Sequence, residues 1–265
     1  MPEVTANGLK IHYRDVGEGF PIVFLHGFTG NTRNWALTVP SLSDRFRCVS
    51  IDHPGHGQSG RPAGTAFYAL SGMAAVAYDA IRAIGIEECY LVGHSMGGMI
   101  SQHIILDHPE FVRGLVLVDT AAAPITGAES WSEKLRQTAR EEGIEAAFDL
   151  RSKHDPRAAD PAFLRLWREQ FLMTSVDAYV GGSLAMRDRD PLLDRLAALT
   201  VPALIVCGEN DEPFRQPSRA LQEAIAGSEL VMIADSGHSP ALEQPAAFNR
   251  ALSGFLDRVH AAAPA

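Results

Sequence analysis

The chain has 265 residues, of which 46% are hydrophobic, and its formal net charge at pH 7 is −9. This length and hydrophobic content are sufficient for a full buried core. The negative balance disfavours a nucleic-acid partner or an anionic membrane surface, because both attract clustered Lys and Arg. The 3 cysteines lie in apolar runs, which predicts small core side chains in a reducing compartment rather than a disulfide framework.

Residues 1–10 contain no basic patch followed by an apolar stretch, so no secretory signal is visible. No apolar run approaches the ~20 residues that a membrane-spanning helix requires. We therefore expect a cytoplasmic protein.

In chain order, residues 9–15 alternate between apolar and polar and predict an edge strand in a hairpin. Continuous Val, Ile and Leu runs follow, typical of strands covered on both faces, at 21–26, 46–51, 89–92, 114–119, 203–207 and 229–233. Helices are predicted between them, at 33–42, 70–84, 96–107, 191–198, 216–225 and 245–259. The repeated order of strand and helix predicts an α/β fold with a parallel sheet between helices.

The interval between Asp119 and Thr200 contains no run that predicts a strand. We expect residues 121–188 to form an inserted helical cap, and residues 1–120 and 189–265 to form the core. Most apolar side chains of the cap are expected to bury its underside. The candidates for lining a substrate pocket are His94, Trp131, Phe148, Trp167, Phe171 and Met186.

The most informative local pattern is Gly-His-Ser-Met-Gly-Gly at 93–98, between an apolar strand and helical spacing. A strand, a tight turn and a helix would hold the Ser95 hydroxyl at the apex as a nucleophile. We expect a strained backbone at Ser95, with glycine at 93 and 97 because a Cβ there would collide with neighbouring turns. The Met96 N–H would then point toward an oxyanion. A nucleotide-binding loop is disfavoured, because Gly-x-Gly-x-x-Gly is absent.

A serine nucleophile needs a base, and the base needs an orienting acid. Of the 10 histidines, His94 adjoins Ser95, so its side chain diverges from the hydroxyl. Four others, His12, His108, His154 and His260, lie on an edge strand, at a helix end, in the cap or in the tail. His238 differs, because it follows the last strand in a polar loop before the final helix. It is the predicted base.

Asp211 lies just beyond the strand at 203–207, and one helix and one strand separate it from His238. Adjacent parallel strands, about 4.8 Å apart, end at the same edge of a sheet, which is where ligands bind in open α/β sheets. Asp211 is therefore the predicted acid. Its rivals are Glu209, Glu212 and the serious competitor Asp119, which ends the preceding strand.

Two further loops follow strands at the same edge. The turn at His26-Gly27-Phe28 can present the Phe28 N–H as a second oxyanion donor beside that of Met96. His26 is expected to brace this loop by hydrogen bonding rather than to transfer a proton. The glycine-rich loop at 52–59 is expected to support it.

These features together resemble the α/β-hydrolase superfamily over residues 9–259. The matching motifs are the elbow at 93–98, the His-Gly loop at 26–28, the Asp-x-x-Gly-x-Gly-x-Ser loop at 52–59, the acid Asp211 and the Gly-His pair at 237–238. The resemblance implies a mostly parallel eight-stranded sheet whose second strand is antiparallel, an active-site order of Ser, Asp and His, and no cofactor.

The residues favour a serine hydrolase that cleaves a carboxylic ester or lactone by acyl transfer. Similar enzymes with an aspartate nucleophile, the epoxide hydrolases and haloalkane dehalogenases, are disfavoured by Ser95. Carbon–carbon bond hydrolases are the leading alternative, although they usually show Gly-Pro-Gly where this chain has Phe28-Thr29-Gly30. Cofactor-free haloperoxidases, enol-lactonases and the menaquinone-pathway synthase that eliminates pyruvate are also similar. That synthase commonly carries an arginine where this chain has Met99-Ile100.

A hypothesis of another class is a ligand receptor with a slow Ser, His and Asp set. A metal hydrolase on Asp52, His53 and His56 is weak, because no helical His-x-x-x-His is present. The apolar cap favours a medium-sized, mostly apolar substrate. Cap arginines leave an anionic substrate open, namely Arg151, Arg187 and Arg189. The sequence leaves the oligomeric state undefined.

Overall fold

The computed structural model describes residues 2–125, 127 and 129–262. An eight-stranded sheet runs in the order β1-β2-β4-β3-β5-β6-β7-β8. The strands are β1 (Glu3–Ala6), β2 (Leu9–Val16), β3 (Pro21–Leu25), β4 (Arg47–Ile51), β5 (Cys89–His94), β6 (Val112–Val118), β7 (Ala203–Gly208) and β8 (Glu229–Ile233). Strand β2 is antiparallel to both of its neighbours, and every later pair is parallel. The predicted fold class is confirmed.

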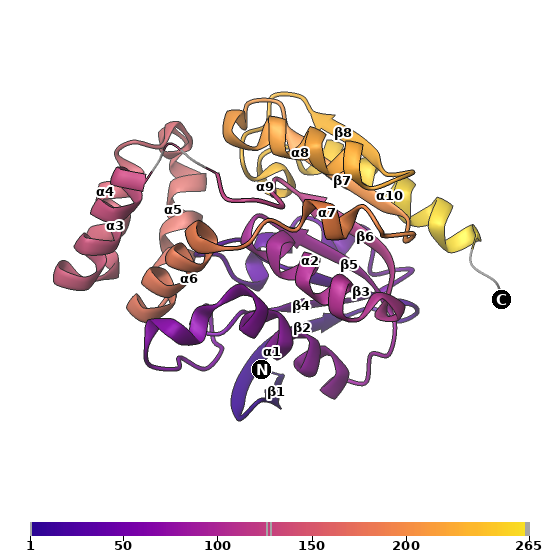
Figure 1. Cartoon of the computed structure of the whole chain (residues 1–265), viewed down its shortest axis with the longest axis horizontal. Helices are drawn as coiled ribbons and strands as arrows, with labels where there is room; N and C mark the ends of the chain where they lie inside the picture. Colours follow the sequence, from indigo (N-terminus) through magenta and orange to yellow (C-terminus); the bar gives the residue numbers. More distant parts are fainter. Residues whose placement is uncertain (1, 126, 128, 263–265) are drawn as a thin grey trace.

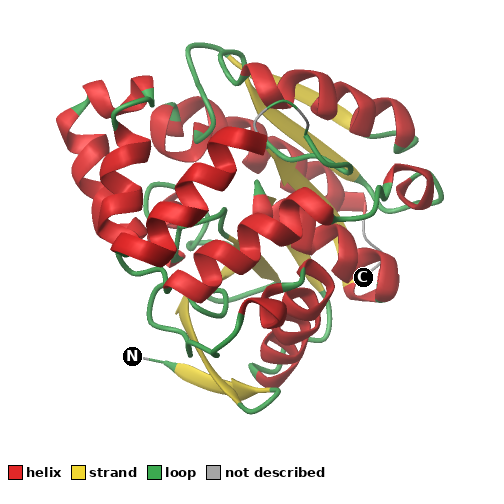
Figure 2. Cartoon of the chain, turned by 60° about the vertical axis from the view of Figure 1, so that its left-hand side comes forward, coloured by secondary structure: helices red, strands yellow, loops and turns green. Residues whose placement is uncertain are grey.

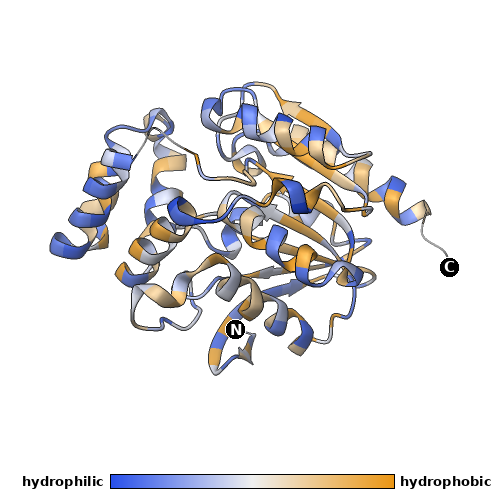
Figure 3. Cartoon of the chain, in the orientation of Figure 1, coloured by the Kyte–Doolittle hydropathy of each residue, from blue (hydrophilic) through white to orange (hydrophobic). Residues whose placement is uncertain are grey.

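Helices cover both faces of the sheet (Figure 2) because the strands are apolar on both sides. In β3, Val23 and Leu25 face one core cluster, whereas Ile22 and Phe24 face the other. The core helices are α1 (Leu70–Ala83), α2 (Met96–Asp107), α7 (Leu193–Leu196), α8 (Glu212–Ala224), α9 (Pro240–Glu243) and α10 (Pro245–Ala262). Helices α1, α2, α7 and α8 supply the first cluster and α10 supplies the second. The hydropathy colouring shows apolar strands inside this sandwich (Figure 3).

Between β6 and α7, where no strand is described, four inserted helices project to one side of the core (Figure 1). They are α3 (Glu129–Glu142), α4 (Ile144–Ser152), α5 (Pro161–Phe171) and α6 (Val176–Asp188). Their apolar side chains form a cluster of their own. Phe28 packs against both this cluster and the first core cluster, so it joins the helical layer to the loop after β3. The division into a cap at 121–188 and a core stays a prediction.

Several predicted boundaries change. The helix expected at 33–42 is replaced by two short 3-10 turns, because Pro40 lacks an N–H and Asn31 caps the first turn. Helix α8 begins directly after Asp211, four residues earlier than predicted, since its first turn tolerates Pro213. The 3-10 turns are η1 (Thr32–Trp35), η2 (Val39–Ser41), η3 (Thr65–Tyr68), η4 (Pro109–Phe111) and η5 (Pro156–Ala159).

The segment predicted as an edge strand at 9–15 belongs to β2, which pairs with β1 and β4 and so lies inside the sheet. The predictions for the other segments agree more closely. Helix α2 and strand β8 have the predicted bounds. The three cysteines are free and buried, as expected of core side chains. Within the described residues, no helix combines the length and the apolar character needed to cross a membrane.

Candidate active site

The turn at Ser95 has the strained geometry predicted for it. Ser95 has φ 52° and ψ −116°, in a region that non-glycine residues rarely adopt. Its N–H donates to the Val118 carbonyl at 2.8 Å, and the Thr120 hydroxyl donates to the Ser95 carbonyl at 2.7 Å. A Cβ at Gly93 would overlap the Ser101 hydroxyl, and one at Gly97 would overlap the Leu25 carbonyl oxygen. The glycine requirement is therefore confirmed.

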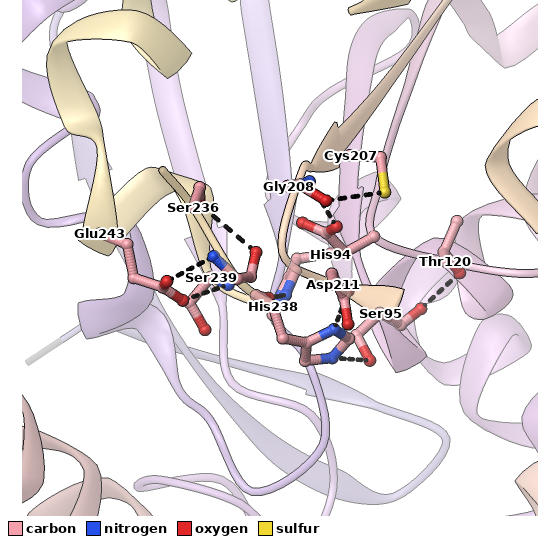
Figure 4. Close-up of polar contacts among 12 residues, drawn as sticks. His94, Ser95, Thr120, Cys207, Gly208, Asp211, Ser236, His238, Ser239 and Glu243 are labelled. Carbon is pink, nitrogen blue, oxygen red and sulfur yellow. Dashed lines mark hydrogen bonds and ion pairs between the residues drawn. The ribbon is translucent and has the colours of Figure 1, made fainter. Parts of the chain in front are cut away.

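A continuous chain of hydrogen bonds links Ser95 to two loops that are remote in sequence (Figure 4). His238 Nε2 lies 3.0 Å from Ser95 Oγ, and His238 Nδ1 lies 2.7 Å from Asp211 Oδ2. Strand β5 ends immediately before Ser95, β7 ends three residues before Asp211, and β8 leads into the His238 loop. Because these parallel strands end at one edge, the three side chains meet there. Ser95 and Asp211 are each only 6% exposed.

The rival acids occupy other positions. Glu209 and Glu212 are exposed, whereas Asp119 is fully buried and its Oδ1 accepts the Gly208 N–H at 2.9 Å. One polar atom each of Asp119, Asp211 and His238 lie within 4.8 Å of one another. The His238 Nδ1 hydrogen bond nevertheless goes to Asp211.

The two neighbouring carboxyl groups are pushed toward opposite protonation states. Burial, and then the negative charge of Asp211, raise the pKa of Asp119 well above its ordinary value. Burial also acts to raise the pKa of Asp211, but the hydrogen bond and charge of His238 outweigh it, so the pKa of Asp211 is lowered. The environment thus favours the protonated form of Asp119 and the ionised form of Asp211.

The His238 loop is held from two sides. His94 Nε2 lies 2.6 Å from the His238 carbonyl oxygen, to which it donates (Figure 4). Glu243 accepts the N–H groups of Gly237 at 2.6 Å and Ser239 at 2.8 Å. Burial, and then the charge of His238, lower the pKa of His94 to about 3, so its ring stays neutral and keeps this donor role. His94 therefore supports the base through its backbone.

Replacing His94 with alanine is expected to lower kcat about tenfold to a hundredfold, because small displacements of a reacting group cost up to about 10²-fold in rate. His94→Gln carries an amide N–H near the position of Nε2 and is expected to recover most of the rate. Steady-state kinetics on a chromogenic ester measures both variants, with circular dichroism as the check on folding. A folded His94→Ala with the wild-type rate would contradict this positioning role.

The loop after β3 rests on the loop after β4, as predicted. His26 Nε2 accepts the His53 N–H at 2.9 Å, and His26 Nδ1 donates to the Gly27 carbonyl at 2.8 Å. Asp52 accepts the Thr32 N–H at 2.7 Å. Both ring nitrogens of His26 are thus engaged in bracing the loop rather than in proton transfer.

This loop lies against the beginning of α2, because Gly97 closely approaches the carbonyl oxygens of Leu25 and His26. Met96 is the first residue of α2, where helical N–H groups have no acceptor within the helix. The loop that carries Phe28 and the helix start that carries Met96 are therefore neighbours.

A cavity of about 220 Å³ opens above Ser95 and His238. Of the residues predicted to line a pocket, His94, Trp167 and Met186 line this cavity. Trp131, Phe148 and Phe171 do not, so their assignment is corrected. They pack in the cluster between the inserted helices, where Phe148 and Phe171 are almost fully buried.

Sequence reasoning missed several cavity-lining residues, namely Arg157, Phe163, Leu166, Gln170 and Phe214. Phe163, Leu166, Trp167 and Gln170 form an i, i+3, i+4, i+7 stripe along α5, a periodicity that was readable in the sequence. Phe214 follows Asp211 by one helical turn, and its ring centroid lies 4.6 Å from that of His238.

The sheet order and the strand–turn–helix at Ser95 are those of the α/β-hydrolase fold. A family model described as "alpha/beta hydrolase fold" matches residues 21–245, and the chain belongs to the α/β-hydrolase superfamily. It is 31% identical to the 2-hydroxymuconate semialdehyde hydrolase of Pseudomonas sp. (strain CF600), with 98% of this chain and 95% of that protein covered.

Two solved structures share the fold over nearly the whole chain. The enol-lactonase from Burkholderia xenovorans LB400 has a TM-score of 0.87 and 28% identity, covering 97% of this chain and 100% of that one. A thermophilic esterase from Thermogutta terrifontis has a TM-score of 0.87 and 25% identity, covering 98% of each chain. The three similar proteins described above are hydrolases by name, which supports an enzyme.

Proposed function

We propose that the protein is a serine hydrolase that cleaves a small carboxylic ester or lactone through an acyl-enzyme at Ser95. The observation that carries the proposal is the hydrogen-bond chain in which His238 lies 3.0 Å from Ser95 Oγ and 2.7 Å from Asp211. A hydroxyl, an imidazole and a carboxylate in this order activate a weak nucleophile for acyl transfer. The similarity to an enol-lactonase and an esterase supports the same class of substrate.

In the proposed reaction, His238 accepts the Ser95 proton as Oγ attacks the carbonyl carbon. Asp211 orients the imidazole and stabilises its cation. The backbone N–H groups of Phe28 and Met96 donate to the oxyanion. His238 then gives the proton to the leaving alkoxide and afterwards takes one from the water that hydrolyses the acyl-enzyme.

Covalent labelling with a fluorophosphonate tests this proposal, because the probe reacts with an activated serine. We expect the wild type to gain one adduct, located at Ser95 by mass spectrometry, and a folded Ser95→Ala to gain none. A folded wild type that stays unlabelled would contradict the nucleophile assignment. Turnover of p-nitrophenyl acetate and butyrate completes the test, since a single burst without steady hydrolysis would favour a receptor instead.

A carbon–carbon bond hydrolase is the second candidate, favoured by the 31% identity to 2-hydroxymuconate semialdehyde hydrolase. The same three side chains would serve that reaction. A ring-cleavage diketone is therefore assayed beside esters and lactones. Hydrolysis of the diketone alone would replace the ester proposal by this candidate.

A further inference from the structure

The wall of the Ser95 cavity carries positive charge without an acidic side chain in it. Arg151 and Arg157 line the cavity, and among the described residues no Asp or Glu does. A guanidinium is a permanent cation with donors in a planar fork. The two arginines are held very differently.

Arg157 forms hydrogen bonds and ion pairs with neighbouring side chains. Its Nε and Nη2 donate to Asp155 at 2.9 and 2.7 Å, and its Nη1 donates to the Ser239 hydroxyl at 3.1 Å. Glu243 lies 4.0 Å from the same Nη1. Arg157 thus ties the inserted helices to the residue after His238, and its charge is already compensated.

Arg151 has no such partner. No carboxylate within the described ranges forms an ion pair with it, and its buried Nε has no hydrogen-bond acceptor there. The side chain contacts the Tyr179 hydroxyl, and its guanidinium carbon lies 5.8 Å from the centroid of the Trp167 ring. The charge of Asp155 acts on it, but that carboxylate is shared with Arg157. The Arg151 guanidinium therefore lines the cavity without a carboxylate partner of its own among the residues that the structure describes.

A second side chain on this wall has an unsatisfied donor. Gln170, on α5, is 3% exposed, and its amide nitrogen has no acceptor in the described part of the chain. Rotation about its terminal bond can present either amide atom to the cavity. Buried polar groups are normally hydrogen-bonded, so two orphaned donors around one cavity indicate that a ligand supplies the acceptors.

We propose that Arg151 and Gln170 form a subsite for a carboxylate group that the substrate carries in addition to its scissile ester or lactone bond. A planar anion with two acceptor oxygens matches the guanidinium fork. The cavity, at about 220 Å³, is below the range of about 300–1,000 Å³ typical of ligand pockets, which favours a short substrate such as the half-ester of a small dicarboxylic acid. This inference rests on the proposed function, because it places the scissile carbonyl at Ser95.

Monomethyl glutarate and monomethyl glutaramate test the subsite, because they share one ester bond and differ only in a carboxylate or a neutral amide at the far end. We expect the wild type to prefer the anion by about tenfold to a hundredfold in kcat/KM, the factor that a hydrogen bond to a charged group contributes. In Arg151→Gln this ratio is expected to fall at least tenfold. A wild type that hydrolyses both esters without the preference, or an Arg151→Gln variant that keeps it, would overturn the proposal.

The matched control is Arg165→Gln, which removes an exposed arginine from α5 and is expected to leave the ratio unchanged. Gln170→Glu is a second variant, because it puts a near-isosteric negative charge into a cavity wall that lacks one. We expect it to remove the preference for the anion while thermal melting shows a folded protein. Retention of the wild-type ratio in folded Gln170→Glu would also contradict the subsite.

Binding of the product separates the subsite from the proposed reaction. Titration of glutarate into Ser95→Ala, measured by calorimetry, is expected to show binding that Arg151→Gln in the same background weakens at least tenfold. If the wild type hydrolyses neither ester but glutarate binds through Arg151, the proposed function fails and the subsite stands. If both esters are hydrolysed equally and glutarate does not bind, the subsite fails and the proposed function stands.

Discussion

Asp211→Asn is expected to lower kcat about 10⁴-fold, whereas Asp119→Asn is expected to stay within about tenfold of the wild type. Asp211 Oδ2 accepts the His238 Nδ1–H at 2.7 Å, and an asparagine amide there favours the wrong tautomer of the imidazole. Burial and the charge of Asp211 raise the pKa of Asp119 and so favour its protonated form. Asparagine has nearly the same shape as a protonated aspartic acid and is also uncharged. It tolerates the φ of 42° at this position.

Steady-state hydrolysis of one chromogenic ester by both variants provides the measurement. The two substitutions are chemically identical, so each controls for the other. A large loss in Asp119→Asn with a small one in Asp211→Asn would transfer the orienting role to Asp119, the acid at the end of β6. Equal large losses in folded proteins would show that the carboxyl pair acts as one unit.

The pH dependence of folding stability tests the protonation of Asp119 independently of the enzyme kinetics. The unfolded chain ionises Asp119 above its ordinary pKa, whereas the folded protein keeps this carboxyl protonated to higher pH. The unfolded state therefore binds fewer protons in that window, and stability falls as pH rises. Asp119→Asn removes this loss, so its melting temperature at neutral pH is expected to equal or exceed that of the wild type.

The parts of the site that sequence alone predicted are those fixed by local chain geometry. The strand, strained serine and helix at 89–107 form a continuous segment, and the structure places them within two residues of expectation. The meeting of Ser95, Asp211 and His238 follows from parallel strands that end at one edge. Neither inference requires knowledge of distant packing.

The residues that line the cavity could not be predicted in the same way, because their direction depends on how the inserted helices pack. Trp167 and Phe171 are one turn apart on α5 and are both aromatic. Trp167 lines the cavity, whereas Phe171 enters the cluster between the helices. Arg151 and Arg157 are likewise two arginines of the same inserted segment. The structure shows that Arg157 forms an ion pair with Asp155, and the sequence does not show which arginine does so.

Acidification is expected to unfold the protein near pH 5, because four histidines are buried as neutral rings. Burial lowers the pKa of His53 to about 3, of His56 to about 4 and of His94 to about 3, and it lowers the pKa of His26 well below its usual value. Protonation would give His26 a second N–H facing the His53 N–H that it now accepts. His53 Nδ1 and His56 Nε2 are buried without acceptors in the described residues, so an added proton there has no partner.

The direction of the change in stability with pH follows from how many protons the folded and unfolded states bind. Below the unfolded pKa of about 6.5, the unfolded chain binds protons that the folded chain refuses, so stability falls as pH falls toward the folded values. Each such histidine costs about 2 kcal/mol by pH 5. The summed cost of the four histidines lies within the ~5–15 kcal/mol free energy of unfolding of ordinary domains. Asp119 contributes with the opposite sign, but it is a single group.

The free energy of unfolding in urea, measured between about pH 7.5 and pH 5, tests this expectation. His56→Asn keeps a donor for the Pro54 carbonyl, which His56 Nδ1 contacts at 2.9 Å, and removes the titrating ring. Its stability is expected to fall less steeply, by about 1.4 kcal/mol per pH unit, than that of the wild type. His154→Asn changes an exposed histidine on the inserted helical layer and is expected to follow the wild-type curve. A wild-type stability that is flat down to pH 5 would mean that these rings are protonated in the folded protein, and the bracing of the Phe28 loop by neutral His26 would then need another explanation.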